Sequence, residues 1–263
     1  MGRIESKLTS LRQARKKALV FFSTAGYPKQ DSTPGIAEAL EQGGADMLEI
    51  GMPFSDPLAD GPVIQHSSMV AIQNGVTLET IFDGVRQIRK RSAIPLILMG
   101  YLNPIMGFGV KKFFSEAAVS GVDGIILPEL PLEEIYRFKE DLRSNNLSQI
   151  LLVTPTTSKE RITSIDAAAC GFLYCVSTAG VTGTSRTTDI KTYLKRIRES
   201  TSKNPLLVGF GISTPDDAAT VAAVSDGVII GSALIRQIEK DAGPAELRKW
   251  ANAFRTALDT MSN

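Results

Sequence analysis

Short runs of β-branched and apolar residues alternate along the chain with longer stretches whose apolar residues recur at helical spacing. Eight such runs predict buried strands: Leu19–Ser23, Met47–Gly51, Leu96–Tyr101, Gly124–Leu127, Ile150–Thr154, Phe172–Val176, Leu206–Gly209 and Gly227–Ile230. Alternating strands and helices favour parallel strands joined by right-handed crossovers. Eight units of this kind predict an α/β fold, a (β/α)₈ TIM barrel, in a single domain over residues 1–263.

Three predicted strands follow the same motif, in which an aspartate joins the end of a helix to a buried strand. The segments are Gly-Ala-Asp46-Met-Leu-Glu-Ile-Gly, Gly-Val-Asp123-Gly-Ile-Ile-Leu-Pro and Val-Ser-Asp226-Gly-Val-Ile-Ile-Gly. This repetition indicates that the fold is built from one repeated helix–strand unit. A doubly wound open sheet is the alternative, but its Gly-x-Gly-x-x-Gly dinucleotide fingerprint is missing after the first strand.

Two further helices are expected outside the repeated units. Ile4, Leu8 and Leu11 stand at helical spacing in a basic N-terminal segment, which predicts a helix docked on its own barrel. Binding of this helix to a membrane or a partner is the alternative. A second, short helix over Leu234–Lys240 follows the last strand. No uninterrupted apolar run approaches the length of a membrane span, so we expect a soluble protein.

Charge and cysteine content narrow the classes of partner and compartment. The formal net charge is +1 and the charged residues are interspersed, which argues against a nucleic-acid partner. Two cysteines, Cys170 and Cys175, lie in or beside apolar sequence. This usage suits a reducing compartment better than a disulfide framework, and we expect a cytoplasmic protein.

The stretch Glu49-Ile-Gly-Met-Pro-Phe-Ser-Asp-Pro-Leu-Ala-Asp60-Gly-Pro62 places two carboxylates on either side of an apolar, proline-rich turn. Glu49 lies in a predicted buried strand, and charged residues are rarely fully buried without a partner or a task. The three prolines fix their φ angles, which predicts an ordered loop. In a barrel, chemistry takes place at the C-terminal ends of the strands. Glu49 and Asp60 are therefore candidate catalytic residues.

Other catalytic groups are disfavoured by number or position. The single histidine, His66, cannot form a multi-histidine metal site, and we expect it on a helix face. No lysine stands at a predicted strand end, which argues against a Schiff-base nucleophile. Neither cysteine has a histidine nearby in a recognisable arrangement. Carboxylate acid–base chemistry remains.

Apolar and aromatic residues are expected at the mouth of the barrel: Phe22, Phe54, Met99, Tyr101, Leu127, Tyr174 and Phe210. Each of them alone is typical of a core residue. Together they suit a flat apolar ligand that carries a phosphate tail. The same surroundings would desolvate Glu49 and raise its pKa toward neutrality, as a general acid–base requires.

Glycines after the last two strands predict a phosphate site. The seventh strand ends in Gly209-Phe-Gly211, and the eighth ends in Gly231-Ser232-Ala233 directly before a short helix. Barrels often bind phosphate with these two loops and the N-terminus of an extra helix. Tight barrel turns without a ligand are the alternative. The long segment Ser177–Thr188 after the sixth strand, rich in small and hydroxyl residues, is either a lid or a linker loop.

The motifs together closely resemble those of the tryptophan synthase α subunit family. The resemblance rests on Glu49 to Gln65, Tyr101-Leu-Asn-Pro104, Gly121 to Pro131, Ser177-Thr-Ala-Gly-Val-Thr-Gly183, Gly209-Phe-Gly-Ile-Ser213 and Gly231-Ser-Ala233, in order across nearly the whole chain. The first motif is long and specific. The glycine clusters would fit many phosphate-binding barrels.

The resemblance implies retro-aldol cleavage of indole-3-glycerol phosphate to indole and glyceraldehyde 3-phosphate in L-tryptophan biosynthesis, without a metal or organic cofactor. It implies that Glu49 is the general acid–base and that Asp60 accepts a hydrogen bond from the indole N–H. It assigns ring binding to Phe22, Met99, Leu127 and Phe210 with Tyr101 and Tyr174 nearby, phosphate binding to Gly183, Gly211, Gly231 and Ser232, and the lid to the segment of Thr182.

The resemblance also implies a partner, the pyridoxal-phosphate-containing β subunit, in an α₂β₂ heterotetramer that passes indole from α to β. We expect Pro53–Asp60 and Pro104–Gly109 to form part of that contact, because both are apolar and stiffened by proline. Three positions depart from the family pattern: Glu129, Thr178 and the Met69/Val70 pair. A mainly regulatory, poorly active subunit and a stand-alone lyase are the alternative functions.

Overall fold

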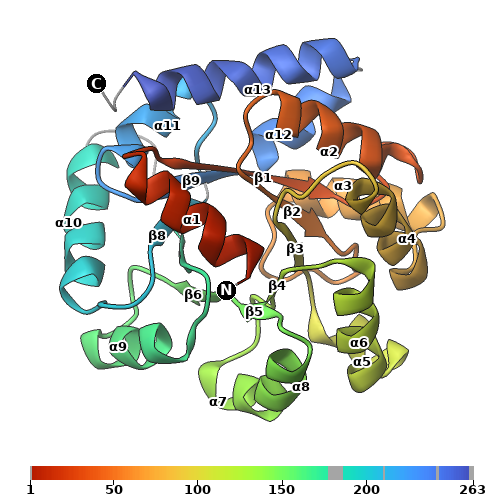
Figure 1. Ribbon diagram of the computed structural model, residues 1–263, viewed down its shortest axis with the longest axis horizontal. Coiled ribbons are helices and arrows are strands. Elements are labelled where there is room, and N and C mark those ends of the chain that lie inside the picture. Colours follow the sequence, from red (N-terminus) through yellow and green to blue (C-terminus); the bar gives the residue numbers. More distant parts are fainter. Residues whose placement is uncertain (1, 177–185, 210, 241–242, 261–263) are drawn as a thin grey trace.

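The chain forms a closed barrel of parallel strands surrounded by helices (Figure 1). This computed structural model describes residues 2–176, 186–209, 211–240 and 243–260. The strands are β1 (Ala18–Thr24), β2 (Met47–Gly51), β3 (Leu96–Met99), β4 (Gly124–Ile126), β5 (Ser148–Gln149), β6 (Leu151–Val153), β7 (Leu173–Val176), β8 (Leu206–Gly209) and β9 (Gly227–Ile230). In the described part of the chain all strand pairs are parallel, in the order β5-β4-β3-β2-β1-β9-β8-β7-β6. The predicted TIM barrel is confirmed.

The barrel closes at one strand position that is divided in two. The prediction of a single strand over Ile150–Thr154 is wrong in this detail, because β5 pairs with β4 while β6 pairs with β7. Ile150 stands between the two pieces, and its N–H donates to the Ile125 carbonyl at 3.2 Å. The two halves of one segment bind different neighbours, which splits the strand without adding a ninth unit.

The helices that alternate with the strands lie on the outside of the barrel, as Figure 1 shows. Those before β4 are α1 (Arg3–Gln13), α2 (Ser32–Gln42), α3 (Pro62–Gln73), α4 (Leu78–Arg89), α5 (Leu102–Phe108) and α6 (Val110–Ser120). Those after β4 are α7 (Leu132–Ile135), the 3₁₀ turn η1 (Tyr136–Phe138), α8 (Lys139–Ser144), α9 (Lys159–Ala168), α10 (Arg186–Glu199), α11 (Pro215–Ala222), α12 (Ser232–Glu239) and α13 (Pro244–Asp259). The predicted short helix after the last barrel strand is α12.

The three repeated aspartates perform the same task at the N-terminal ends of the strands. Each accepts the N–H of a residue near the start of the neighbouring strand, at 2.7–2.9 Å: Leu19 for Asp46, Leu96 for Asp123 and Leu206 for Asp226. Each also pairs with an arginine from an outer helix: Arg255, Arg89 and Arg198 in the same order. The repeated sequence motif therefore marks a repeated set of contacts, in which an aspartate connects two adjacent strands and an outer helix.

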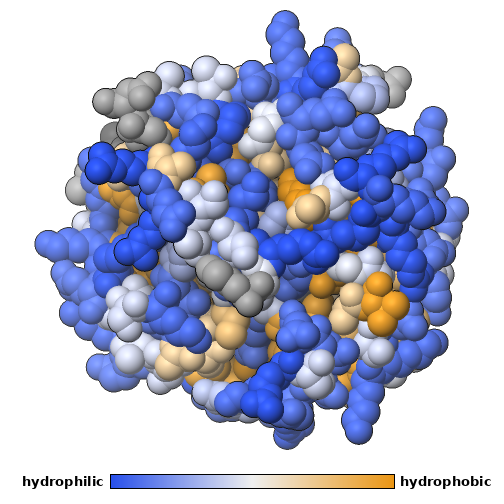
Figure 2. Space-filling model, viewed as in Figure 1, coloured by the Kyte–Doolittle hydropathy of each residue, from blue (hydrophilic) through white to orange (hydrophobic). Residues whose placement is uncertain are grey.

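Helix α1 covers the N-terminal end of the barrel, as its apolar pattern predicts. Ile4, Leu8 and Leu11 are buried. Ile4 packs so closely that a Cβ added at Gly124 would lie 2.9 Å from it. Arg3 pairs with Asp123 at 2.8 Å, which fixes the start of the helix. In Figure 1 α1 lies across the strands, and Figure 2 shows a predominantly hydrophilic surface on this face.

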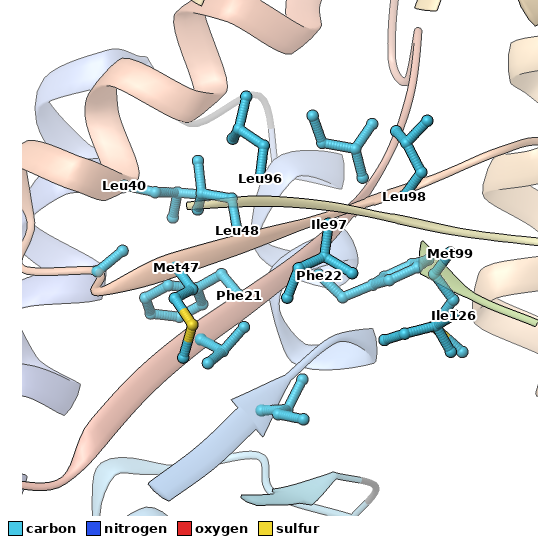
Figure 3. Close-up of a cluster of buried hydrophobic side chains, with 14 of the residues drawn as sticks. Phe21, Phe22, Leu40, Met47, Leu48, Leu96, Ile97, Leu98, Met99 and Ile126 are labelled. Atoms are coloured by element: carbon cyan, nitrogen blue, oxygen red, sulfur yellow. The ribbon is translucent and has the colours of Figure 1, made fainter. Parts of the chain in front are cut away.

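The strands alternate between two apolar layers. Figure 3 shows Leu96 and Leu98 on one side of β3 and Ile97 and Met99 on the other. All four side chains are buried, as expected for a barrel strand with helices outside and packed side chains inside. Met99 is the last residue of β3 and so lies at the C-terminal end of the strand, where the predicted site lies.

Candidate active site

Glu49 is a fully buried carboxyl group in the middle of β2. Its exposed fraction is 0%, and in strand register it stands between Phe22 of β1 and Ile97 of β3. Neither carboxyl oxygen has a hydrogen-bond partner within the described residues. Burial disfavours the charged form and raises the pKa of Glu49 from 4.5 to about 8. A protonated carboxyl group that can exchange its proton near neutral pH is thus held inside the barrel.

A glycine makes room for the aromatic ring nearest to Glu49 in the strand register. A Cβ added at Gly51 would lie 2.5 Å from Cζ of Phe22, so a larger residue there would displace the ring. Phe22 and Met99 are both buried, and Met99 pairs with Gly51 in the register. Leu127, directly after β4, is buried as well. The predicted ring-binding residues Phe22, Met99 and Leu127 therefore lie on or directly after strands of one continuous run, β4-β3-β2-β1, which also carries Glu49.

Asp60 lies in the loop between β2 and α3, where Tyr101 reaches it from the end of β3. The Tyr101 hydroxyl donates to Oδ2 of Asp60 at 3.0 Å. Burial raises the pKa of Asp60, the Tyr101 hydrogen bond lowers it, and the charge of Glu129 raises it again, for a net increase. The two candidate catalytic carboxylates are therefore in different environments: one has no partner and the other is held by a tyrosine.

Tyr174 interacts electrostatically with both carboxylates from β7, which lies four strands along the barrel from β2. It lies on β7 and is buried, and its pKa is raised well above the ordinary value by burial and then by the charges of Glu49 and Asp60. A Cβ at Gly209 would lie 2.2 Å from the Tyr174 hydroxyl oxygen, so this glycine leaves the space that the hydroxyl group occupies. The charges of both candidate carboxylates therefore reach Tyr174, and its place in the ring site stays a prediction.

The predicted phosphate site is a helix start close to the ring-binding end. Gly231 precedes α12 and Ser232 is its first residue. The Leu234 and Ile235 N–H groups bond to the Gly231 carbonyl, and the helix start has no intrahelical partner for the N–H groups of Ser232 and Ala233. Such N–H groups, with the helix dipole, favour an anion.

The two predicted phosphate-site glycines among the described residues are Gly231 and Gly211. A Cβ at Gly231 would lie 3.6 Å from Phe22, so the start of α12 adjoins the proposed ring site. Gly211 is exposed and has a φ of 75°, a conformation that favours glycine. Phe210, Thr182 and Gly183, with Thr178 and most of the predicted lid, lie outside the described residues.

The requirements of a metal site and of a membrane-spanning helix can be compared with the described part of the chain. That part contains no group of three or more histidine, cysteine, aspartate or glutamate side chains that could hold a metal ion. His66 is exposed on α3, as expected for a helix-face residue. Within the same ranges, no helix combines the length and apolar character that crossing a membrane requires.

Comparison with known proteins identifies the family of the chain. The family model "Tryptophan synthase alpha chain" matches residues 8–262. The chain belongs to this family. A relative from Geotalea daltonii is 46% identical over 263 residues, covering 99% of this chain and 96% of its own, and one from Flavobacterium psychrophilum is 44% identical, covering 96% and 99%. The crystal structure of tryptophan synthase subunit alpha from Legionella pneumophila superposes with a TM-score of 0.92 at 39% identity, covering 99% of each chain.

Membership of the tryptophan synthase alpha chain family makes the chain a lyase of tryptophan biosynthesis, as the resemblance implied. The hypothesis of a mainly regulatory, poorly active subunit is not favoured. The 39–46% identity extends over nearly the whole chain, so the likeness includes the barrel and the loops that carry the candidate site.

Two features of the site were missed by sequence reasoning. Tyr101 was predicted only near the ring, whereas its hydroxyl bonds to Asp60. Glu129 was noted only as a departure from the family pattern, whereas its Oε1 accepts the Leu102 N–H at 2.6 Å and its charge acts on Asp60. The position of Tyr101 directly after a strand was an available signal, but the direction of its hydroxyl depends on the fold.

Proposed function

We propose that the chain cleaves indole-3-glycerol phosphate to indole and glyceraldehyde 3-phosphate at the C-terminal ends of the barrel strands. The observation that carries this proposal is Glu49, a fully buried carboxyl without a partner among the described residues, whose pKa lies at about 8. A structural role would require hydrogen bonds that satisfy the group. A general acid–base requires a pKa near the working pH and access to a substrate proton.

Glu49 moves the two protons that a retro-aldol cleavage requires. Since its pKa is about 8, it is mostly protonated at neutral pH and can give its proton to indole C3, which makes the ring an indoleninium ion. The resulting carboxylate takes the proton of the C3′ hydroxyl. The C3–C3′ bond then breaks, its electron pair restores the neutral indole ring, and the hydroxyl carbon leaves as the aldehyde. The same carboxyl group ends protonated, ready for another turnover.

Asp60 stabilises the positive charge that develops on the indole nitrogen. With Oδ2 held by Tyr101, the carboxylate can accept the indole N–H through its other oxygen. A negative charge placed where positive charge develops stabilises the transition state more than the ground state. Phe22, Met99, Leu127 and Tyr174 would surround the ring, and the start of α12 with Gly211 would bind the phosphate. The proposal also assigns ring binding to Phe210, phosphate binding to Gly183 and the lid to the segment of Thr182.

A β subunit that consumes indole is the proposed partner, in an α₂β₂ heterotetramer. Two exposed apolar side chains support a contact surface at the predicted place: Leu58 of the Asp60 loop is 94% exposed and Met106 of α5 is 62% exposed. Tyr101 adjoins both segments, because it bonds to Asp60 and is the N-cap residue of α5.

Free Cys170 and Cys175 favour a reducing compartment, so we propose that the enzyme is cytoplasmic.

A coupled assay of indole-3-glycerol phosphate cleavage by the full chain tests the function. We expect indole release by the chain alone and a faster rate when its cognate β chain is added, because the Asp60 loop would adjoin the partner. No cleavage in either state would overturn the proposal. A rate that is high alone and does not change with the β chain would instead favour the stand-alone lyase.

The partner surface is tested by the substitutions Leu58→Asp and Met106→Asp. Each places a charge in an apolar contact, and we expect each to weaken β-chain binding by about 5-fold to 30-fold, as for the loss of a central interface residue. The matched control is Val119→Asp, which changes a side chain that is 75% exposed at the end of α6, toward the opposite end of the barrel. Calorimetric titration measures the dissociation constants. Unchanged binding in both loop variants would contradict this surface.

A further inference from the structure

Tyr101 holds the Asp60 loop at three separate points. Its ring contacts Phe54 with a centroid distance of 5.3 Å and an interplanar angle of 33°. Its hydroxyl accepts the Ala59 N–H and donates to Oδ2 of Asp60, both at 3.0 Å. Phe54 and Ala59–Asp60 lie near the two ends of the loop that follows β2. A single side chain from the end of β3 therefore connects the start and the end of this loop.

The direction of these hydrogen bonds fixes the part that Asp60 plays in them. The Tyr101 hydroxyl accepts the Ala59 N–H and has one proton of its own to donate. That proton goes to Oδ2 of Asp60, which is the acceptor. Within the described residues no hydrogen bond to Oδ1 of Asp60 is found, so Oδ1 is the oxygen left for a ligand N–H. The bond to Tyr101 thus fixes the orientation of the carboxyl group and favours its ionised form, which is the stronger acceptor.

Glu129 brings a second negative charge to the same pair. It follows β4, and its Oε1 accepts the N–H of Leu102, the residue after Tyr101, at 2.6 Å. The carboxylate is exposed, but the hydrogen bond fixes it at the start of α5. Its charge raises the pKa of Asp60 and of Tyr101. The charged or ionisable groups that act on Asp60 from neighbouring elements are Tyr101, Glu129 and Tyr174.

We propose that Tyr101 and Glu129 are positioning residues for this lyase: Tyr101 orients Asp60 toward the indole N–H through the hydroxyl bond, and Glu129 opposes that bond by its charge. The inference rests on the proposed function of Asp60 and goes beyond it. Tyr101 would not need to touch the reacting atoms, because it acts through Oδ2.

Tyr101→Phe tests the role of the hydroxyl while keeping the ring that contacts Phe54. We expect kcat to fall by about 10-fold to 100-fold, as for a catalytic group that is misplaced by about 1 Å, with KM changed by less than about threefold. The reason is that Asp60 interacts most strongly in the transition state, when the nitrogen carries positive charge. Tyr136→Phe is the matched control, since it removes a hydroxyl from a half-exposed tyrosine of η1. It should leave both constants unchanged.

The pH profile separates positioning from a general loss of structure. Asp60 must be ionised, so its pKa sets the acidic limb of kcat/KM. Removing the Tyr101 hydrogen bond raises that pKa and should move the acidic limb to higher pH. Glu129→Gln keeps an acceptor for the Leu102 N–H but removes the charge, and should move the limb to lower pH. The alkaline limb, set by Glu49, should stay near its wild-type position in both variants.

A double-mutant cycle with Asp60→Asn decides whether Tyr101 acts through Asp60. In the Asp60→Asn background, Tyr101→Phe should lower kcat by less than about twofold, because the carboxylate it positions is gone. A full additional loss in that background, or limbs that shift in the same direction in Tyr101→Phe and Glu129→Gln, would overturn the inference. A wild-type chain that cleaves no substrate would instead refute the proposed function, so the two failures are distinguishable.

Discussion

Glu49→Gln should reduce the rate of indole release by about 10²-fold to 10⁴-fold, which is the contribution that a positioned general acid–base typically makes. Glutamine has nearly the size of glutamate and is uncharged, as the buried Glu49 mostly is at neutral pH. It can neither give nor take the protons of the cleavage. Because no described group bonds to Glu49, the substitution breaks no hydrogen bond in this part of the chain. The loss should therefore appear in kcat.

Two measurements make this result specific. Binding of glycerol 3-phosphate, a probe for the α12 start alone, should remain within about threefold of wild type, because the phosphate site does not include Glu49. The control is Glu246→Gln, which makes the same chemical change on the exposed first turn of α13. Its turnover should match that of the wild-type chain. Unchanged indole release by Glu49→Gln would remove Glu49 from the mechanism.

The barrel could be predicted from the sequence because burial on both faces leaves a plain signal. Each barrel strand is covered by helices outside and packed side chains inside, so it reads as a short apolar run between helical patterns. β2, β8 and β9 begin and end where the apolar runs predict. The repeated aspartates were equally visible, because each must stand directly before a strand to accept the N–H of its neighbour. Both the strands and the aspartates could be predicted because each depends on residues that are close together in the sequence.

Glu49 could be predicted as a candidate, since a carboxylate within an apolar strand conflicts with local rules and such conflicts tend to mark functional sites. The division of the fifth strand could not be predicted, because it depends on which neighbour each half meets when the barrel closes. The hydroxyl bond between Tyr101 and Asp60 was equally hidden, since these residues are 41 positions apart. Contacts of this kind are set by the packing of several elements and leave no periodic trace.

Glu49 should also make the folded chain less stable as pH rises, and this loss should disappear in Glu49→Gln. The folded-state pKa of Glu49, about 8, lies above the ordinary value of 4.5. The native state therefore holds a proton that the unfolded chain releases, and stability falls with rising pH between these two values. With about 1.36 kcal/mol per pKa unit, the loss between pH 5 and pH 9 is on the order of 4 kcal/mol.

Chemical denaturation of both proteins at pH 5, 7 and 9 measures this effect. The two free energies of unfolding should be similar at pH 5, where both side chains are uncharged, and the variant should become the more stable protein by on the order of 4 kcal/mol at pH 9. All other ionisable groups are shared, so they cancel in the difference. Glu246→Gln should follow the wild-type curve. If the difference between wild type and Glu49→Gln does not grow with pH, Glu49 does not carry a raised pKa, and its assignment as the neutral-pH proton donor fails with it.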